Sequence, residues 1–195
     1  MATVLLIRHA EKPTPDDAVK GVDEAGRPDS HELSVLGWQR AGALAALLGN
    51  KAAVQRLGLE PPRHLFAPRP TENKPSERSM HTLQPLADAL GLSIHLDFAV
   101  GQEGALAQRV AGLNDCVLIA WQHEGIVKIA QELAGKEQAV PDNWPTDRYD
   151  LARHDLSPTA TTTARGRPVR PHRLNSPALQ AWAHLQLSMK RLSRS

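Results

Sequence analysis

Short apolar runs separated by helical patterns dominate the first three quarters of the chain. Runs with the length and composition of strands lie at residues 4–7, 64–67, 93–97 and 117–121. Two stretches show the three- and four-residue apolar spacing of a helix packed on a sheet: Met80, Leu83, Ala87, Leu90 and Ile126, Ile129, Ala130, Leu133. This alternation predicts an α/β fold, a three-layer α/β/α sandwich with a mostly parallel central sheet.

Polar side chains that can take part in chemistry follow two of these strands closely. Arg8 and His9 come directly after the first strand, and His123 comes two residues after the last one. Ligands of open α/β sheets bind at the carboxyl ends of the strands, so these side chains lie where chemistry is expected. An imidazole beside a guanidinium suits attack on phosphorus, because the arginine neutralises the anion that the ring nitrogen must approach.

A second arginine is predicted at the start of a helix. Ser76 is expected to be the N-cap residue of this helix, which places Arg78 in its first turn. The free main-chain N–H groups at that end of a helix also favour anions. The sequence thus offers two arginines and two histidines to an anionic ligand.

These motifs, in this order, resemble those of the histidine phosphatase superfamily, also called phosphoglycerate mutase-like. The hallmarks of that family are an Arg-His pair after the first strand, an arginine at a helix start with threonine four residues on, and a histidine after a late strand. The matching residues here are Arg8, His9, Arg78, Thr82 and His123. The resemblance covers about three quarters of the chain.

One further phrase is typical of the family, and one position departs from it. The helix-start phrase Leu33-Ser34-x-x-Gly37-x-x-Arg40-Ala41 is common in these proteins. The family usually has glycine directly after the second histidine, whereas Glu124 stands here between His123 and Gly125.

The resemblance implies a small phosphatase without a cap insertion and with a phosphoglycerate mutase-like fold. Neutral His9 would attack phosphorus and form a phosphohistidine that water then hydrolyses. Arg8 and Arg78 would bind the phosphoryl oxygens, and His123 would be protonated and add positive charge. No metal or other cofactor is implied, because arginine and histidine supply the cationic surroundings.

Three carboxylates are candidates for the general acid that protonates the leaving oxygen. Glu103 is the best placed, because the family's acid lies beyond the second arginine and Glu103 opens the helix after the strand at 93–97. It could instead be a helix N-terminal carboxylate favoured by the macrodipole. Glu11 and Glu124 are alternatives near the pocket in sequence, and either could simply hold one of the arginines in place.

The span between the second arginine and the second histidine favours hydrolysis over phosphoryl transfer. It is only 45 residues (123 − 78), whereas mutases of the superfamily carry a much larger insertion there that retains an intermediate. The resemblance therefore implies hydrolysis of a phosphorylated small molecule or a phosphoprotein. The bond that is hydrolysed would be a phosphate monoester or a protein phosphohistidine. A phosphoglycerate mutase-type phosphotransferase and a non-catalytic phosphate-binding protein are the alternatives.

Composition fits one soluble catalytic domain. The 195 residues are 41% hydrophobic, which suits a sizeable core. The first strand is predicted almost at Met1, which leaves no room for a signal peptide, and no apolar run is long enough to span a membrane. Cys116 is the single cysteine and is expected to be a small core residue. These features predict a cytoplasmic protein.

The last quarter of the chain is strongly basic. No acidic residue follows Asp155, and seven cationic side chains give this segment a charge of +7: Arg165, Arg167, Arg170, Arg173, Lys190, Arg191 and Arg194. We predict a catalytic domain at 1–155, a basic Pro-, Thr- and Arg-rich segment at 156–175 and a helix at 176–195. A solvated terminus explains the charge better than nucleic-acid binding does.

The other histidines lack the paired spacing of metal ligands, such as His-Glu-x-x-His. They are expected to be exposed or hydrogen-bonded structural residues: His31, His64, His81, His95, His154, His172 and His184. An aromatic and charged cluster at 144–150 could rim the pocket, or anchor a loop by its buried rings.

Overall fold

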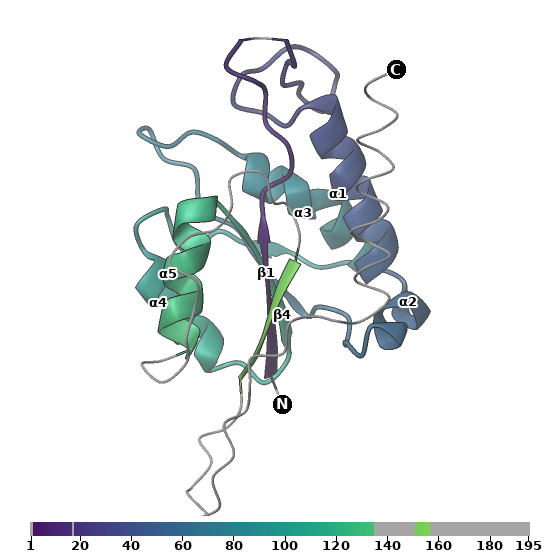
Figure 1. Ribbon diagram of the computed structural model, residues 1–195, viewed down its shortest axis with the longest axis vertical. Helices are drawn as coiled ribbons and strands as arrows, with labels where there is room; N and C mark the ends of the chain where they lie inside the picture. The colour runs from purple at the N-terminus through teal and green to yellow at the C-terminus, as the bar shows by residue number, and fades with distance from the viewer. Residues whose placement is uncertain (1, 17, 135–150, 157–195) are drawn as a thin grey trace, which may run out of the picture.

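The computed structural model describes residues 2–16, 18–134 and 151–156, which form ten helices and strands. In chain order these elements are β1 (Ala2–Arg8), α1 (Val35–Leu48), α2 (Lys51–Arg56), β2 (His64–Phe66), α3 (Arg78–Leu90), β3 (Ile94–His95), α4 (Glu103–Ala111), β4 (Cys116–Trp121), α5 (His123–Ala134) and β5 (Leu151–Leu156). The strands build one central sheet, with helices on both sides of it (Figure 1).

The sheet is mostly parallel, as predicted. Its strand order is β3-β2-β4-β1-β5. Neighbouring strands from β3 to β1 are parallel, and β5 pairs antiparallel with β1. The strand β5 was not expected from the sequence, because Arg153, His154 and Asp155 interrupt any apolar run there. This strand is recognised from its pairing with β1. The local pattern of apolar residues does not predict it.

Helices cover both faces of the sheet and complete the three-layer sandwich. One face packs on α1, α2 and α3, and its core includes Leu44, Val54 and Leu83. The other face packs on α4 and α5, whose core residues include Leu106 and Ile126. In Figure 1 the two groups of helices lie on opposite sides of β1 and β4.

The central strands are apolar throughout because both of their faces are buried. In β1, Leu5 and Ile7 belong to the core on the α1 side, whereas Val4 and Leu6 belong to the core on the α5 side. All four are at most 3% exposed. Burial of each such side chain contributes about 1.5–3 kcal/mol, so β1 and β4 form the rigid base on which the polar residues at their ends are mounted.

The start of α3 differs in one detail from the prediction. Ser76 is not the N-cap residue: Glu77 occupies that position and makes no side-chain capping hydrogen bond. The hydroxyl of Ser76 donates instead to the carbonyl of His31 at 3.3 Å. Arg78 nevertheless begins the helix, so its placement in the first turn is confirmed.

Several predictions concern residues outside the described ranges. These are the cluster at 144–150, the basic segment from 157 onward and the helix at 176–195. The strand β5 ends at Leu156, one residue beyond the domain boundary expected from the sequence. Among the helices that are described, none is long and apolar enough to cross a membrane.

Candidate active site at the carboxyl end of the sheet

The two histidine-bearing segments lie side by side at the carboxyl ends of β1 and β4. These strands are parallel neighbours, and Arg8 is paired with Trp121. The main-chain N–H of His9 donates to the carbonyl of Trp121 at 3.0 Å. His123 begins α5 two residues later. The pairing of β1 and β4, predicted only as two separate strands, therefore brings both histidines to one edge.

The imidazole of His9 is buried and held in one tautomer. Its residue is 8% exposed, and Nδ1 lies 2.7 Å from the carbonyl oxygen of Ala10. A carbonyl can only accept, so we assign the ring proton to Nδ1, which leaves Nε2 with a free lone pair. Burial lowers the pKa of His9 from 6.5 to about 4, although the hydrogen bond to Ala10 opposes this shift. His9 is thus a neutral base at pH 7.

Cationic side chains surround the two histidines. The charges of Arg8, Arg78 and Lys12 each lower the pKa of His9, after the larger effect of burial. Burial also lowers the pKa of His123, against the charge of Glu124, and Arg8 and Lys12 add to the lowering. Arg8 therefore acts on both imidazoles, as expected for residues around one anion site.

Lys12 was not selected from the sequence as a site residue. It is exposed and lies on the loop that follows β1. Its charge nevertheless reaches His9 and His123 alike. Its position four residues after Arg8 was the only sequence signal, and nothing local distinguishes it from an ordinary surface lysine.

Thr82 ties the loop after β1 to α3. Its Oγ1 accepts the main-chain N–H of Ala10 at 2.8 Å and donates to the carbonyl of Arg78 at 2.7 Å. Ala10 in turn is the residue whose carbonyl accepts from His9. One buried hydroxyl thus connects the histidine and the second arginine, which explains why a threonine four residues after that arginine is useful.

The helix-start phrase at 33–41 holds Glu11 in place. Ser34 caps α1 and donates its main-chain N–H to the carbonyl of Glu11 at 2.9 Å. Gly37 is needed for close approach, because a Cβ there would lie 2.5 Å from the same carbonyl. Arg40 Nε donates to both carboxylate oxygens of Glu11, at 2.8 and 2.7 Å.

This ion pair bears on the search for a general acid. The carboxylate of Glu11 is engaged by Arg40, a different arginine from the two proposed to bind phosphate. The side chains of both partners are 14% exposed. Glu11 is therefore suited to fixing the loop after His9, and poorly suited to delivering a proton.

Glu103 lies at the first position of α4 and is 4% exposed. Its Oε1 accepts from the main-chain N–H of Gly101 at 3.0 Å and from the indole Nε1 of Trp121 at 3.1 Å. Burial raises the pKa of Glu103, but these hydrogen bonds and the charge of Lys128 outweigh it, so the pKa is lowered overall. Glu103 is thus near the end of β4 but in the carboxylate form, which is not the form of a general acid.

Gly125 allows this contact between Trp121 and Glu103. The indole of Trp121 crosses the first turn of α5, and a Cβ on residue 125 would lie 2.2 Å from its Cδ1. The same Cβ would lie 3.0 Å from Oε1 of Glu103. The glycine that follows the second histidine region therefore serves packing.

His123 is the more open of the two histidines. Its side chain is 25% exposed, and Nε2 lies 3.1 Å from Oε1 of Glu124, whose side chain is 62% exposed. Because its pKa is lowered, His123 is neutral at pH 7 in the protein alone, and its protonation in the presence of a phosphoryl group stays a prediction. A bound phosphoryl group would bring negative charge and raise that pKa.

Glu32, Glu77 and His81 form a cluster of ligand-type side chains beside Arg78. Among the described residues it is the group whose possible metal-ligand atoms all lie within 4.8 Å of one another. A direct hydrogen bond of 2.6 Å between Glu32 and His81 accounts for the proximity of those two. His81 is thus a hydrogen-bonded residue, as expected of it from the sequence.

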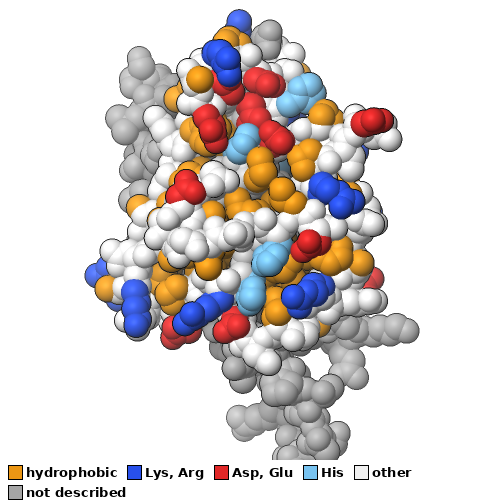
Figure 2. All heavy atoms as spheres, turned by 180° about the vertical axis from the view of Figure 1, so that it is seen from behind, with side chains coloured by type: hydrophobic (Ala, Val, Ile, Leu, Met, Phe, Trp, Pro, Cys, Tyr) orange, Lys and Arg blue, Asp and Glu red, His pale blue; other side chains and the backbone are white. Residues whose placement is uncertain are grey.

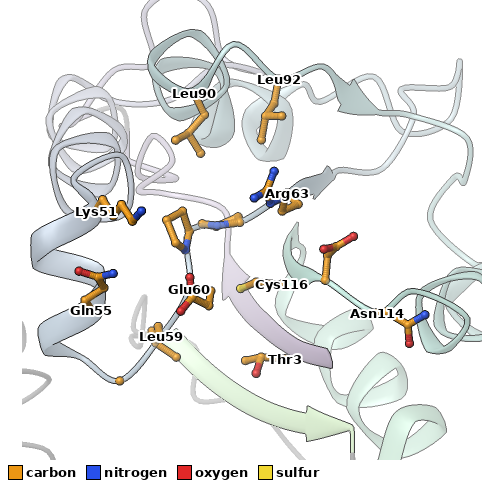
Figure 3. Close-up of a pocket in the computed structure, with 14 residues that line it drawn as sticks. Thr3, Lys51, Gln55, Leu59, Glu60, Arg63, Leu90, Leu92, Asn114 and Cys116 are labelled. Carbon is orange, nitrogen blue, oxygen red and sulfur yellow. The ribbon is translucent and has the colours of Figure 1, made fainter. Parts of the chain in front are cut away.

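A cavity of about 820 Å³ opens at the other end of the sheet. Figure 3 shows Lys51 and Gln55 of α2, Arg63 before β2 and Cys116 at the start of β4 around it. None of the candidate catalytic residues lines this cavity. Cys116 is 5% exposed and belongs to the core, as predicted.

The surface near the candidate site carries both signs of charge. The loop after β1 lies at the top of Figures 1 and 2, where acidic and basic side chains crowd together. Exposed Asp16, Glu24 and Asp29 belong to this loop, as do exposed Lys12 and Lys20. The surface at this end of the sheet is therefore not uniformly basic.

This chain is similar to several solved structures. No protein-family model and no curated protein matches the chain. A mycobacterial glucosyl-3-phosphoglycerate phosphatase in complex with VO3 is 15% identical, with 77% of this chain and 90% of that chain covered and a TM-score of 0.43. A candidate phosphohistidine phosphatase, SixA from Agrobacterium tumefaciens, is 17% identical, with 77% and 89% covered and a TM-score of 0.44.

Proposed function

We propose that this protein is a metal-independent phosphatase that works through a phosphohistidine intermediate on His9. The observation that carries the proposal is that the imidazole of His9 is buried and neutral, with its proton assigned to Nδ1. The charges of Arg8 and Arg78 both lower its pKa. A neutral ring nitrogen among fixed cations is what attack on a phosphoryl dianion requires.

The reaction follows from these groups. The lone pair of His9 Nε2 forms a bond to phosphorus while the bond from phosphorus to the leaving oxygen or nitrogen breaks. Arg8 and Arg78 bind the phosphoryl oxygens through paired N–H donors. His123 adds a donor on the same oxygens and becomes protonated as the negative charge arrives. Water then attacks phosphorus, releases inorganic phosphate and returns the electron pair to Nε2.

The state of Glu103 narrows the proposed substrates. Its lowered pKa keeps it a carboxylate in the ligand-free protein, so it would assist the leaving group as an acid only if a bound phosphoryl group raised that pKa. An aryl phosphate, whose leaving oxygen departs as a stable anion, and a protein phosphohistidine, whose leaving ring takes a proton from solvent on its other nitrogen, are accordingly favoured over alkyl phosphate monoesters.

The same observation favours a second candidate function. A protein with the two arginines and no working acid could bind a phosphorylated ligand without turning it over. The lowered pKa of Glu103 is the feature that supports this non-catalytic reading.

One assay separates the two functions. Turnover of 4-nitrophenyl phosphate is measured for the wild type and for His9→Ala, each with and without a chelator. The phosphatase proposal expects turnover by the wild type that survives the chelator and is lost in His9→Ala. No turnover by a wild type that still binds inorganic phosphate would favour the binding protein, and turnover abolished by the chelator would refute the metal-independent mechanism.

A further inference from the structure

The guanidinium of Arg78 is oriented by main-chain oxygens of the loop that precedes α1. Its Nε donates to the carbonyl of Glu32 at 3.2 Å, and its Nη2 donates to the carbonyl of Ser30 at 2.9 Å. Ser30 is exposed on this loop. The direction of the arginine plane thus depends on how firmly residues 30–32 are held.

We propose that the partly buried pair of Glu32 and His81 positions Arg78 for the phosphoryl group, so that both residues set phosphate affinity without touching phosphate. This inference rests on the proposed function, in which Arg78 binds the phosphoryl oxygens. Glu32 and His81 are positioning residues in this role, not catalytic ones.

Glu32 is attached to α3 at two points. Its carboxylate Oε2 lies 2.6 Å from Nδ1 of His81, and its carbonyl accepts from Arg78. The side chains of Glu32 and His81 are only 8% and 12% exposed. Since residues three apart in a helix share a face, the two attachments fix the plane of the peptide at Glu32 relative to the start of α3.

The ring of His81 is itself held on its other side. It stacks on the indole of Trp38 in α1, with ring centroids 5.3 Å apart and planes inclined by 29°. The indole Nε1 of Trp38 donates to the carbonyl of Val22 at 2.8 Å, and the main-chain N–H of Val22 donates to the carbonyl of Leu33. Leu33 is the residue next to Glu32. The contacts from Glu32 through His81, Trp38 and Val22 therefore lead back to the same loop and connect it with α1 and α3.

A second attachment exists but is weaker. The hydroxyl of Ser76 donates to the carbonyl of His31 at 3.3 Å, in an exposed setting. A buried hydrogen bond between a carboxylate and an imidazole is stronger than an exposed one between a hydroxyl and a carbonyl. The Glu32–His81 pair is therefore the stronger of these two side-chain restraints on the acceptors of Arg78.

A double-mutant cycle tests this inference in the full-length protein. Glu32→Ala is made in the wild type and in Arg78→Ala, and inorganic phosphate is the probe, by calorimetric binding and by competition with 4-nitrophenyl phosphate. We expect Glu32→Ala to weaken phosphate binding about tenfold with Arg78 present, because a small misplacement of a clamp has effects of this size. With Arg78 removed, the same change should cost less than about twofold.

Two further variants separate positioning from general stabilisation. Glu32→Gln retains an oxygen that can accept from Nδ1 of His81 and should restore most of the affinity. Arg27→Ala removes an exposed ion pair on the same loop, 2.7 Å from Nε of Arg27 to Oδ2 of Asp23, and the side chain of Arg27 is 79% exposed; it should leave phosphate affinity unchanged. If Glu32→Ala does not fold by circular dichroism, His81→Gln enters the same cycle.

The outcomes distinguish this inference from the phosphatase proposal. Equal losses with and without Arg78, or a similar loss in Arg27→Ala, would overturn the positioning role even in an active enzyme. A wild type that binds phosphate with the expected coupling but turns nothing over would refute the phosphatase proposal and support the positioning role. A wild type with no phosphate affinity would overturn both.

Discussion

The two histidines follow the carboxyl ends of neighbouring parallel strands but lie in different surroundings. His9 is 8% exposed and is fixed by its own main-chain N–H, by the carbonyl of Ala10 and, through Ala10, by Thr82. The side chain of His123 is 25% exposed, and its neighbour in the structure is the mostly exposed Glu124. A nucleophile needs one tautomer and one direction, whereas a group that only supplies charge can adapt.

This difference predicts unequal losses of activity. His9→Ala should reduce kcat for 4-nitrophenyl phosphate by at least about a thousandfold, because the proposed nucleophile is removed. His123→Ala should reduce it by only about a hundredfold, as for loss of one transition-state donor. Circular dichroism checks that both variants are folded; equal losses would contradict the division of roles.

The pH dependence of stability should follow His9. Burial lowers the pKa of His9 from 6.5 to about 4. Between these two pH values the imidazole is protonated in the unfolded chain and neutral in the native protein. The contribution of His9 is therefore complete above pH 6.5 and is lost as pH falls toward 4, by up to about 3 kcal/mol. Urea unfolding of the wild type and His9→Ala at pH 7.5 and 4.5 measures it; the same pH effect in both would refute the prediction.

Packing at the His123 side can be tested through two glycines. Gly125→Ala should destabilise by about 1–3 kcal/mol, because the new methyl group would lie 2.2 Å from the buried Trp121 ring. Gly104→Ala is the matched control: it also lies in a helix, but its nearest contact would be 3.9 Å away. The control should gain about 0.5–1 kcal/mol. Similar effects of the two substitutions in urea unfolding would show that Trp121 is not tightly held.

The hydrogen bonds on the His9 side can be tested through Thr82. Thr82→Val removes the acceptor of a buried main-chain N–H, that of Ala10, and should cost about 1–2 kcal/mol. Thr14→Val removes the same kind of acceptor, 2.9 Å from the N–H of Val19, at an exposed position. It should cost less than about 0.5 kcal/mol in urea unfolding. A control as damaging as Thr82→Val would argue against a special role for the buried contact.

Glu103→Gln should have the smallest effect on catalysis. The amide keeps an oxygen for the donors at Gly101 and Trp121, and the carboxylate of Glu103 carries no proton to donate at pH 7. We expect less than about a tenfold loss in kcat, equal for 4-nitrophenyl phosphate and for an alkyl phosphate. A larger loss on the alkyl substrate would identify Glu103 as the general acid after all.

Much of the layout could be predicted from local patterns. The apolar runs of β1 and β4 follow from burial on both faces, and the histidines follow those runs directly in the chain. Arg78 was correctly placed in the first turn of α3, although its N-cap was misassigned to Ser76. Strand β5 escaped prediction, because an edge strand with polar residues has no periodic signal of its own.

Contacts between distant residues decided the rest of the site. Thr82 reaches Ala10 across 72 positions, His81 reaches Glu32 across 49, and Arg40 reaches Glu11 across 29. No local spacing encodes such pairs. These long-range contacts place Glu11 in an ion pair with Arg40 and show how the loop before α1 orients Arg78.

By itself, the sequence determined which residues could do chemistry and on which strands and helices they sit, because hydrophobic periodicity and chain order are local properties. Only the tertiary structure decided how far the pKa values of those residues are shifted. Burial and cationic neighbours lower the pKa of His9 and of His123, whereas hydrogen bonds lower the pKa of Glu103 against the effect of its burial. These shifts depend on what packs around each group.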